Sequence, residues 1–349
     1  MLHYKKSTVY ISHMIAHGVD YFMIKQDKIK IFYLGSGAFS VPVLEALTQD
    51  DRIELAGIGT QIDKAAGRKR ILTPTPLGKW CDEHNIPCMR VPSVNAPDFL
   101  DMMRKITPDI VVVVSFGQLL KVDLLNIPKF GCFNVHASLL PAYRGASPIT
   151  TAVLNGDAET GVAFMQMEKG LDTGPIYELH RLPIPDQITT GELEQVLARL
   201  AGEKIGNCLA QVAEGLKPVP QGESGVSIAV KIRKTDGAVD FREDAAVIAR
   251  KIRAFYGWPS MTFRVPVKGR TINVKIMRAK CTSWESPQRQ PGEFIAYTNN
   301  QMMIRCGKGA LLIERVLPEG KKEMSVADFL NGCHVSIGDI LLNGMDDRN

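Results

Sequence analysis

The 349 residues are too many for one ordinary hydrophobic core, and they predict two domains. Hydrophobic residues make up 45% of the chain and charged residues 23%, which is the composition of a soluble globular protein. No apolar run approaches the roughly 18 residues of a membrane span. Seven cysteines without CxxC spacing argue against a disulfide framework or a metal site, and they indicate the reduced thiols of a cytoplasmic protein.

The first 22 residues contain no arginine and no sustained apolar core. This composition argues against a mitochondrial presequence and against a secretory signal. Met23 stands just before the first convincing strand. We therefore expect residues 1–28 to be a flexible extension or the product of a misassigned start.

Residues 29–215 alternate between strand and helix patterns, which predicts an α/β domain with a Rossmann-like, largely parallel sheet. The run IVVVVSFG is the most β-branched of the chain and indicates a central strand. We expect strands at 29–35, 53–60, 86–91, 110–117, 132–138, 161–167 and 175–184. We expect helices at 40–51, 75–85, 96–109, 148–156 and 189–216.

A Pro- and Gly-rich stretch, LKPVPQGESG, interrupts this alternation and begins a linker over residues 216–236. Residues 237–349 then form a second domain, in which a helix at 245–255 precedes short strands separated by turn residues. Such strands predict a small antiparallel barrel. This domain has 17 Lys and Arg against 12 Asp and Glu, so it holds the positive charge excess of the chain.

Three polar residues converge on one end of the predicted sheet. Asn134 and His136 are two apart in a strand, so their side chains share a face. Asp172 lies in a Gly-flanked loop between two strands, from which a carboxylate can reach the same end. Asn offers a neutral donor for developing negative charge, and His transfers protons near neutral pH. Each residue also has a purely structural explanation, as a backbone partner, a core histidine or a turn cap.

Other chemistries fit the sequence less well. Ser138 follows His136 without the strand-turn-helix GxSxG pattern of a hydrolase. One His and one Asp are too few for a zinc site, so we expect no metal. The GSGAF stretch at 35–39 lacks the third glycine of the dinucleotide fingerprint and is better explained as a tight turn. Direct transfer of a carbonyl group to an amine remains.

The stretches NVHASLLPAYRGASPI and NGDAETGVAFMQMEKGLDTGPI resemble the 10-formyltetrahydrofolate-dependent formyltransferase family. The resemblance covers about residues 29–345 and is strongest to the members that act on methionyl-tRNA. VVVVSFGQLL, TQIDKAAGRKRILTPTP and KIRAFYGWPS support it. The chain departs from the family pattern in GSGAF, which lacks an acidic residue, and in AFYGWPS, where Asn-Pro is commoner before Trp258.

The resemblance also implies roles for individual residues. Asn134, His136 and Asp172 match the catalytic trio of the family. Its folate-binding positions match Ser138, Leu139, Leu140 and Pro141, together with Phe116, Gly117, Gln118, Leu119 and Leu120. Its tRNA-contacting loop matches residues 64–70, with Lys64, Arg68, Lys69 and Arg70 as the basic positions. The second domain resembles the OB-like barrel that binds the tRNA stem.

The implied activity is transfer of a formyl group from 10-formyltetrahydrofolate, a co-substrate, to the amino group of methionyl-initiator-tRNA for translation initiation. The expected partners are this tRNA and the folate, and we expect a cytoplasmic monomer. Formyltransferases acting on amino-sugar nucleotides share both domains and are the alternative. A non-enzymatic RNA-binding protein on the same fold is a third possibility, against which the intact trio argues.

Overall fold

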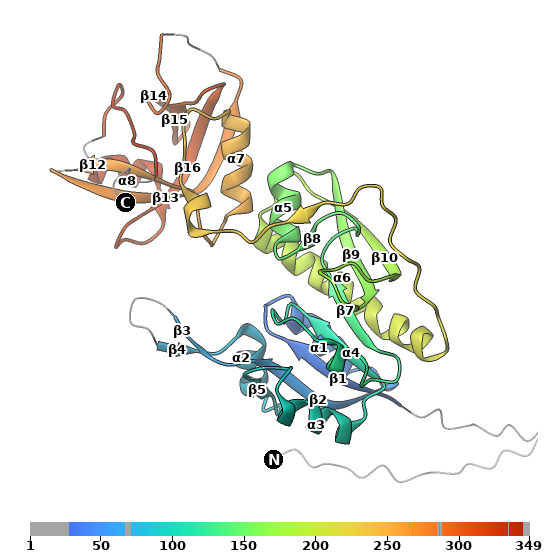
Figure 1. Ribbon diagram of the computed structural model, residues 1–349. Helices are drawn as coiled ribbons and strands as arrows, with labels where there is room; N and C mark the ends of the chain where they lie inside the picture. The colour runs from blue at the N-terminus through green and yellow to red at the C-terminus, as the bar shows by residue number, and fades with distance from the viewer. Residues whose placement is uncertain are drawn as a thin grey trace, which may run out of the picture.

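The computed structural model describes residues 28–66, 71–267, 269–284, 286, 288–333 and 335–344. The extension expected over 1–28 therefore lies outside the described residues, except for its last position. Within the described ranges the chain forms two domains, an α/β domain and a smaller β-rich domain (Figure 1).

The first domain is built on a sheet of seven strands in the order β10-β9-β7-β6-β1-β2-β5 among the described residues. Neighbours from β7 to β5 are parallel, whereas β9 is antiparallel to both β7 and β10. The strands are β1 (Ile29–Gly35), β2 (Ile53–Gln61), β5 (Met89–Val91), β6 (Ile110–Val114), β7 (Cys132–His136), β9 (Glu159–Gln166) and β10 (Ile176–Pro183). The predicted Rossmann-like, largely parallel sheet is confirmed.

Helices cover both faces of this sheet, which explains why its central strands are continuous apolar runs. Along β1, Ile31 and Tyr33 enter one buried cluster while Phe32 and Leu34 enter another. The helices are α1 (Ser40–Thr48), α2 (Pro76–Glu83), α3 (Pro97–Ile106), α4 (Val122–Leu125), α5 (Pro148–Asn155) and α6 (Thr190–Ala213). Sequence periodicity predicted all of these except the single turn of α4.

Helix α6 begins at a capping box that fixes its first turn. The Thr189 hydroxyl accepts a hydrogen bond from the backbone nitrogen of Glu192, and the Glu192 carboxylate accepts one from the backbone nitrogen of Thr189 at 2.9 Å. The Thr190 hydroxyl donates to the carbonyl of Ala254 in the second domain at 2.8 Å. The start of α6 is therefore held at the junction of the two domains.

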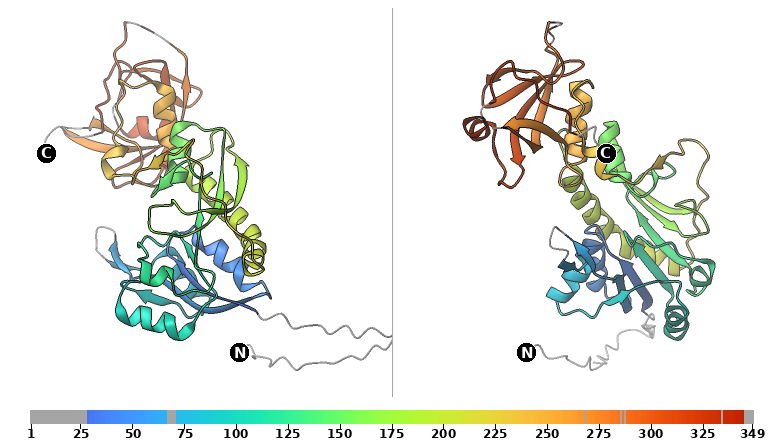
Figure 2. Two further views of the ribbon diagram at one scale, coloured as in Figure 1. Left: turned by 45° about the vertical axis from the view of Figure 1, so that its right-hand side comes forward. Right: turned by 60° about the vertical axis from the view of Figure 1, so that its left-hand side comes forward.

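The second domain is an antiparallel sheet in the order β12-β13-β16-β15-β14, with β17 paired to β16. Its elements are α7 (Ala245–Ala254), β12 (Thr262–Val267), β13 (Arg270–Thr282), β14 (Phe294–Thr298), β15 (Gln301–Arg305), β16 (Ala310–Pro318), β17 (Met324–Ser325) and α8 (Val326–Gly332). The register of β13 against β16 shifts near Arg278, and such irregularities bend a strand. Figure 2 shows the sheet curling into a half-barrel, which confirms the expected small antiparallel barrel class.

Two short strand pairs were not predicted. The first pairs β8 (Arg144–Gly145) with β11 (Ile228–Ala229), and the 3₁₀ turn η1 (Lys234–Gly237) follows β11. Residues 216–236 thus pack along the first domain by backbone pairing as they lead to the second. The other pair is a hairpin of β3 (Lys64–Ala66) and β4 (Ile71–Thr73) that projects from the first domain, where we expected only a loop (Figure 1). The division into four segments, at 1–28, 29–215, 216–236 and 237–349, remains a prediction.

Gly161 in β9 provides a stability prediction. A Cβ atom there would lie 2.2 Å from the carbonyl oxygen of His180 and 2.5 Å from Leu139 Cδ2. Because two packed strands must separate to admit it, Gly161→Ala should lower the free energy of unfolding by about 1–3 kcal/mol. Gly191→Ala in α6 is the control, because a Cβ atom added there would contact nothing within 4 Å beyond its chain neighbours and the backbone of its own helix. Equal urea midpoints for the two variants would contradict the close packing of β9 against β10.

Candidate active site

Two polar side chains lie at the carboxyl end of β7, beside β6 and β9. Asn134 is partly exposed, and His136 is buried with 6% of its surface accessible. Both line a cavity at this edge of the sheet, as their shared strand face predicts. The strand brings an amide and an imidazole to the same space.

The neighbours of His136 define which ring nitrogen exchanges a proton. Nε2 lies 2.9 Å from the carbonyl oxygen of Tyr143, which can only accept a hydrogen bond, so Nε2 carries a hydrogen. Nδ1 lies 3.6 Å from Oδ2 of Asp172. In the neutral ring the lone pair of Nδ1 therefore faces the carboxylate.

Asp172 is held by backbone geometry and by three neighbours. Its φ of 54° is in the left-handed region, which is unusual for a residue other than glycine and is found at functional sites. Oδ2 accepts a hydrogen bond from the backbone nitrogen of Gly145 at 2.8 Å, and Oδ1 lies 3.5 Å from Nδ2 of Asn134. The backbone carbonyl accepts from Gln221 Nε2 at 2.8 Å. The three predicted catalytic residues thus lie together.

Tyr143 is a site residue that sequence reasoning missed. Its φ is 60°, its backbone nitrogen donates to Ser227 Oγ at 2.9 Å, and its hydroxyl donates to Asp157 at 2.6 Å. Burial is the main effect that raises the pKa of this hydroxyl above its usual value, and the hydrogen bond to Asp157 is the second. These contacts fix the carbonyl that orients His136. A backbone carbonyl gives no signal in a sequence pattern.

Arg144 contacts the segment that follows α6. Its Nε and Nη2 donate to Oε1 of Gln221 at 3.1 and 2.7 Å. Nε2 of the same glutamine donates to the carbonyls of Asp172 and Gly174. Arg144 therefore anchors the chain around the loop that carries Asp172.

The cavity beside the trio has a volume of about 640 Å³, within the usual range of small-molecule sites. One wall follows β6, where Ser115, with φ 46°, ends the strand three residues earlier than expected. Its lining includes Phe116, Gly117, Gln118 and Leu119, four of the predicted folate-binding residues. The lining also includes Phe39, Ile149, Thr150, Thr190 and Glu194.

Hydrogen bonds hold the 116–119 wall in place. The carbonyl of Phe116 accepts from Gln61 Nε2 at 2.5 Å, and the side chain of Gln118 bonds to the backbone of Val91, Pro92 and Val94. Gly117 has a φ of 78°, and a Cβ there would lie 2.6 Å from Gln61 Nε2. Leu119 remains 66% exposed, which leaves an apolar side chain available to a ligand.

The other predicted folate residues lie behind this surface. The described residues that line the cavity do not include Ser138, Leu139, Leu140, Pro141 or Leu120. Ser138 is fully buried and donates to the carbonyl of Ala142 at 2.6 Å, while Leu140 packs against Ala163 and Met165. The segment supports the end of β7 and the loop beyond it. Folate contact by these five residues stays a prediction.

Only one of the four predicted basic residues belongs to the described chain. Lys64 is the first residue of β3, and its Nζ donates to Gln61 Oε1 at 2.6 Å. Arg68, Lys69 and Arg70 lie outside the described residues. Because Gln61 also bonds to the carbonyl of Phe116, the base of the hairpin is connected to the cavity wall.

Within the described ranges, no group of three or more His, Cys, Asp or Glu residues is placed to hold a metal ion. In the same ranges, no helix combines the length and the apolar character that crossing a bilayer requires.

Two protein-family models match most of the chain. Residues 27–208 match the formyl transferase model, and residues 231–334 match the model of the formyl transferase C-terminal domain. The chain belongs to the formyl transferase family. The matched ranges contain Asn134, His136 and Asp172 in the first domain and the curled sheet in the second.

Individual formyltransferases resemble the chain along most of its length. It is 37% identical over 305 residues to methionyl-tRNA formyltransferase of Xylella fastidiosa strain M23, covering 87% of this chain and 97% of that one. It is 38% identical over 304 residues to methionyl-tRNA formyltransferase of Methylococcus capsulatus, covering 87% and 96%. The solved structure of WlaRD, a sugar 3N-formyl transferase with dTDP and 5-N-formyl-THF, has a TM-score of 0.55 and 21% identity, covering 84% and 99%. That last likeness shows a shared fold.

Proposed function

We propose that the chain transfers a formyl group from 10-formyltetrahydrofolate to the free amino group of methionyl-initiator-tRNA, using Asn134, His136 and Asp172. The observation that carries the assignment of the site is the arrangement at the end of β7. There Nδ1 of His136 faces the Asp172 carboxylate and Asn134 shares the cavity. The family and its methionyl-tRNA formyltransferase members support the reaction.

Each residue of the trio has a step that its position allows. The folate supplies an activated formyl carbon, which the neutral amine attacks. One hydrogen of Asn134 Nδ2 faces Asp172, and the other is available to the formyl oxygen, where negative charge develops. Nδ1 of His136 takes the proton that the amine loses, and the Asp172 carboxylate stabilises the resulting imidazolium. The same proton then passes to the departing folate nitrogen.

The folate and the acceptor would occupy different parts of the cavity. The wall from Phe116 to Leu119 offers an apolar side chain and backbone groups, which suit the flat folate ring. The part of the lining that includes Phe39, Ile149 and Thr150 would receive the acceptor. The hairpin that begins at Lys64 and the second domain, with its excess of positive charge, would contact the phosphates of the tRNA.

A single assay tests this function. The purified chain is incubated with 10-formyltetrahydrofolate carrying a labelled formyl group and with methionyl-initiator-tRNA, and with amino-sugar nucleotides in parallel. We expect the label in the tRNA fraction alone. Label in the sugar nucleotide would favour the sugar formyltransferase alternative, and tRNA binding without label transfer would favour a non-enzymatic RNA-binding protein.

The assignment of Arg68 to the tRNA is a separate prediction. Arg68→Ala should raise the KM for methionyl-tRNA several-fold, because a lost phosphate contact weakens binding, and should leave folate affinity unchanged. Steady-state kinetics with each substrate varied in turn will measure both constants. Unchanged kinetics on the charged tRNA would remove Arg68 from the interface.

The cellular setting is also part of the proposal. We propose that the chain acts in the cytoplasm as a monomer, since its substrates are a soluble tRNA and a soluble folate. Light scattering during gel filtration measures the mass in solution. A mass of two chains or more would replace the monomer by an oligomer without affecting the assignment of the trio.

A further inference from the structure

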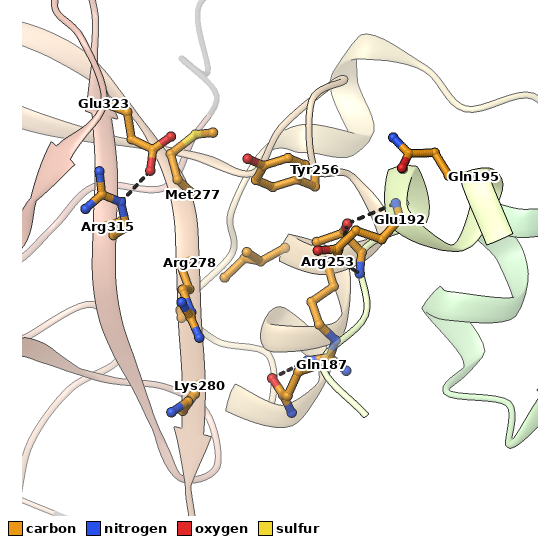
Figure 3. Close-up of a pocket in the computed structure, with 14 residues that line it drawn as sticks. Gln187, Glu192, Gln195, Arg253, Tyr256, Met277, Arg278, Lys280, Arg315 and Glu323 are labelled. Carbon is orange, nitrogen blue, oxygen red and sulfur yellow. Dashed lines mark hydrogen bonds and ion pairs between the residues drawn. The ribbon is translucent and has the colours of Figure 1, made fainter. Parts of the chain in front are cut away.

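A second cavity, of about 500 Å³, lies where the two domains meet (Figure 3). It is a groove between the first turn of α6, the end of α7 and the strands β13 and β16. We call it the junction groove. Its lining is Gln187, Thr189, Gly191, Glu192, Gln195, Ile252, Arg253, Tyr256, Met277, Arg278, Ala279, Lys280, Arg315 and Glu323.

The junction groove adjoins the active cavity across one helical turn. Gly191, Glu192 and Gln195 line the groove, whereas Thr190 and Glu194 line the active cavity. Successive residues of a helix point in different directions, so these two sets are opposite sides of the same turn. A flexible substrate chain that leaves the active cavity over the start of α6 enters the groove.

Most charged groups of the groove already have partners. Arg278 and Lys280 both pair with Glu314, at 3.0 and 3.4 Å, and Arg315 pairs with Glu323. Glu192 belongs to the capping box of α6. These groups present both charges, so they do not by themselves select an anion.

Arg253 differs from the other cations of the groove. In the described part of the chain no carboxylate lies within ion-pair distance of it, and its Nη1 donates only to the carbonyl of Ala249 at 3.3 Å and to Gln187 Oε1 at 3.5 Å. The side chain is half-buried, and this burial lowers the pKa of the guanidinium below its usual value; Arg250 acts in the same direction, and Cys281 and Asp186 oppose it. A half-buried charge with neutral partners is costly, and an incoming anion relieves that cost.

Tyr256 supplies the second element of a binding site. It follows Arg253 by three residues, lines the same groove, and keeps 43% of its surface exposed. Figure 3 shows its ring in the space between Gln195 of the first domain and Met277 of the second. An exposed aromatic ring and a guanidinium that has no ion-pair partner among the described residues line the same groove. This combination suits single-stranded nucleic acid, through one stacked base and one phosphate.

Resting on the proposed function, we propose that the junction groove binds the single-stranded 3′ end of the charged tRNA, with Arg253 on a backbone phosphate and Tyr256 stacked on a base. The groove then guides the strand over the first turn of α6, so that its terminal aminoacyl group reaches His136. Binding of the tRNA in the junction groove precedes the formyl-transfer step. Loss of either side chain should therefore change tRNA affinity and leave the catalytic step intact.

The first test replaces the ring. Tyr256→Ala should raise the KM for methionyl-tRNA by about 5- to 150-fold, the range of one lost base stack, with kcat unchanged. Tyr256→Phe keeps the ring and should behave as the unaltered chain. Tyr297→Ala, which removes a tyrosine of β14 with 41% exposure, is the matched control and should change neither constant.

The second test concerns the charge. Arg253→Gln should weaken tRNA binding and lower the slope of log affinity against log salt concentration by about 0.7, the value of one single-strand phosphate contact. Arg253→Lys should restore most of that slope. Arg199→Ala, an exposed arginine of α6 that does not line the groove, is the control. Thermal unfolding of every variant checks that the domains remain folded.

The outcomes separate this inference from the proposed function. An unaltered chain that formylates methionyl-tRNA, with unchanged KM in Tyr256→Ala and an unchanged salt slope in Arg253→Gln, overturns the groove site alone. A fall in kcat or in the unfolding temperature without a change in KM also overturns it, because it indicates a structural role. An unaltered chain without formylation activity removes both proposals.

Discussion

His136→Ala should lose about 100- to 10,000-fold in kcat for formyl transfer, which is the usual contribution of a positioned general acid or base. The structural reason is that this ring lines the cavity, with Nδ1 toward the Asp172 carboxylate and Nε2 held by the carbonyl of Tyr143. Single-turnover formylation of methionyl-tRNA measures the effect directly. The affinity for folate should not change, because the predicted folate residues that line the cavity, Phe116 to Leu119, follow β6 and not the strand that carries His136.

A matched control exists in the same domain. His180 on β10 also pairs with a carboxylate, Glu178, at 2.7 Å, but it does not line the cavity. His180→Ala should therefore keep its kcat. Near-normal turnover in His136→Ala, or an equal loss in both variants, would remove His136 from the chemistry.

Asp172→Asn should cause a loss in kcat of similar size, about 100- to 10,000-fold. Asparagine retains an oxygen that can accept from the backbone nitrogen of Gly145, so the loop that carries residue 172 can keep its conformation. What disappears is the negative charge that stabilises the imidazolium of His136. Rapid-quench kinetics at saturating folate will measure this loss.

The comparison of two substitutions at this position separates charge from packing. Asp172→Ala removes both the charge and the hydrogen bond to Gly145, and it should be at least as impaired as Asp172→Asn. Normal activity in Asp172→Asn with loss only in Asp172→Ala would show that residue 172 positions the loop and does not take part in proton transfer.

The trio also explains why Arg144 and Gln221 matter to the site although neither lines the cavity. Gln221 holds the carbonyl of Asp172, and Arg144 holds Gln221. The segment after α6 is therefore part of the support of the active site. It connects the loop of Asp172 to the chain that leads into the second domain.

The sequence by itself determined the order of strands and helices in the first domain. Its central strands are buried on both faces, so their sequences are uninterrupted apolar runs, and most of its helices have a clear helical periodicity. It also predicted that Asn134 and His136 share a face, because the period of a strand is two residues. These features depend on neighbours in the chain, which a sequence displays directly.

Only the tertiary structure determined the contacts between distant segments. The pairing of β8 with β11 and the junction groove each join residues far apart in the chain. The contact of the Tyr143 carbonyl with His136 spans only seven residues, but it uses a backbone atom that has no identity in a sequence. The short strands carry no periodic signal in two or three residues. Among the described residues Arg253 has no carboxylate within ion-pair distance, and this too follows from the packing of two domains, which a local pattern does not express.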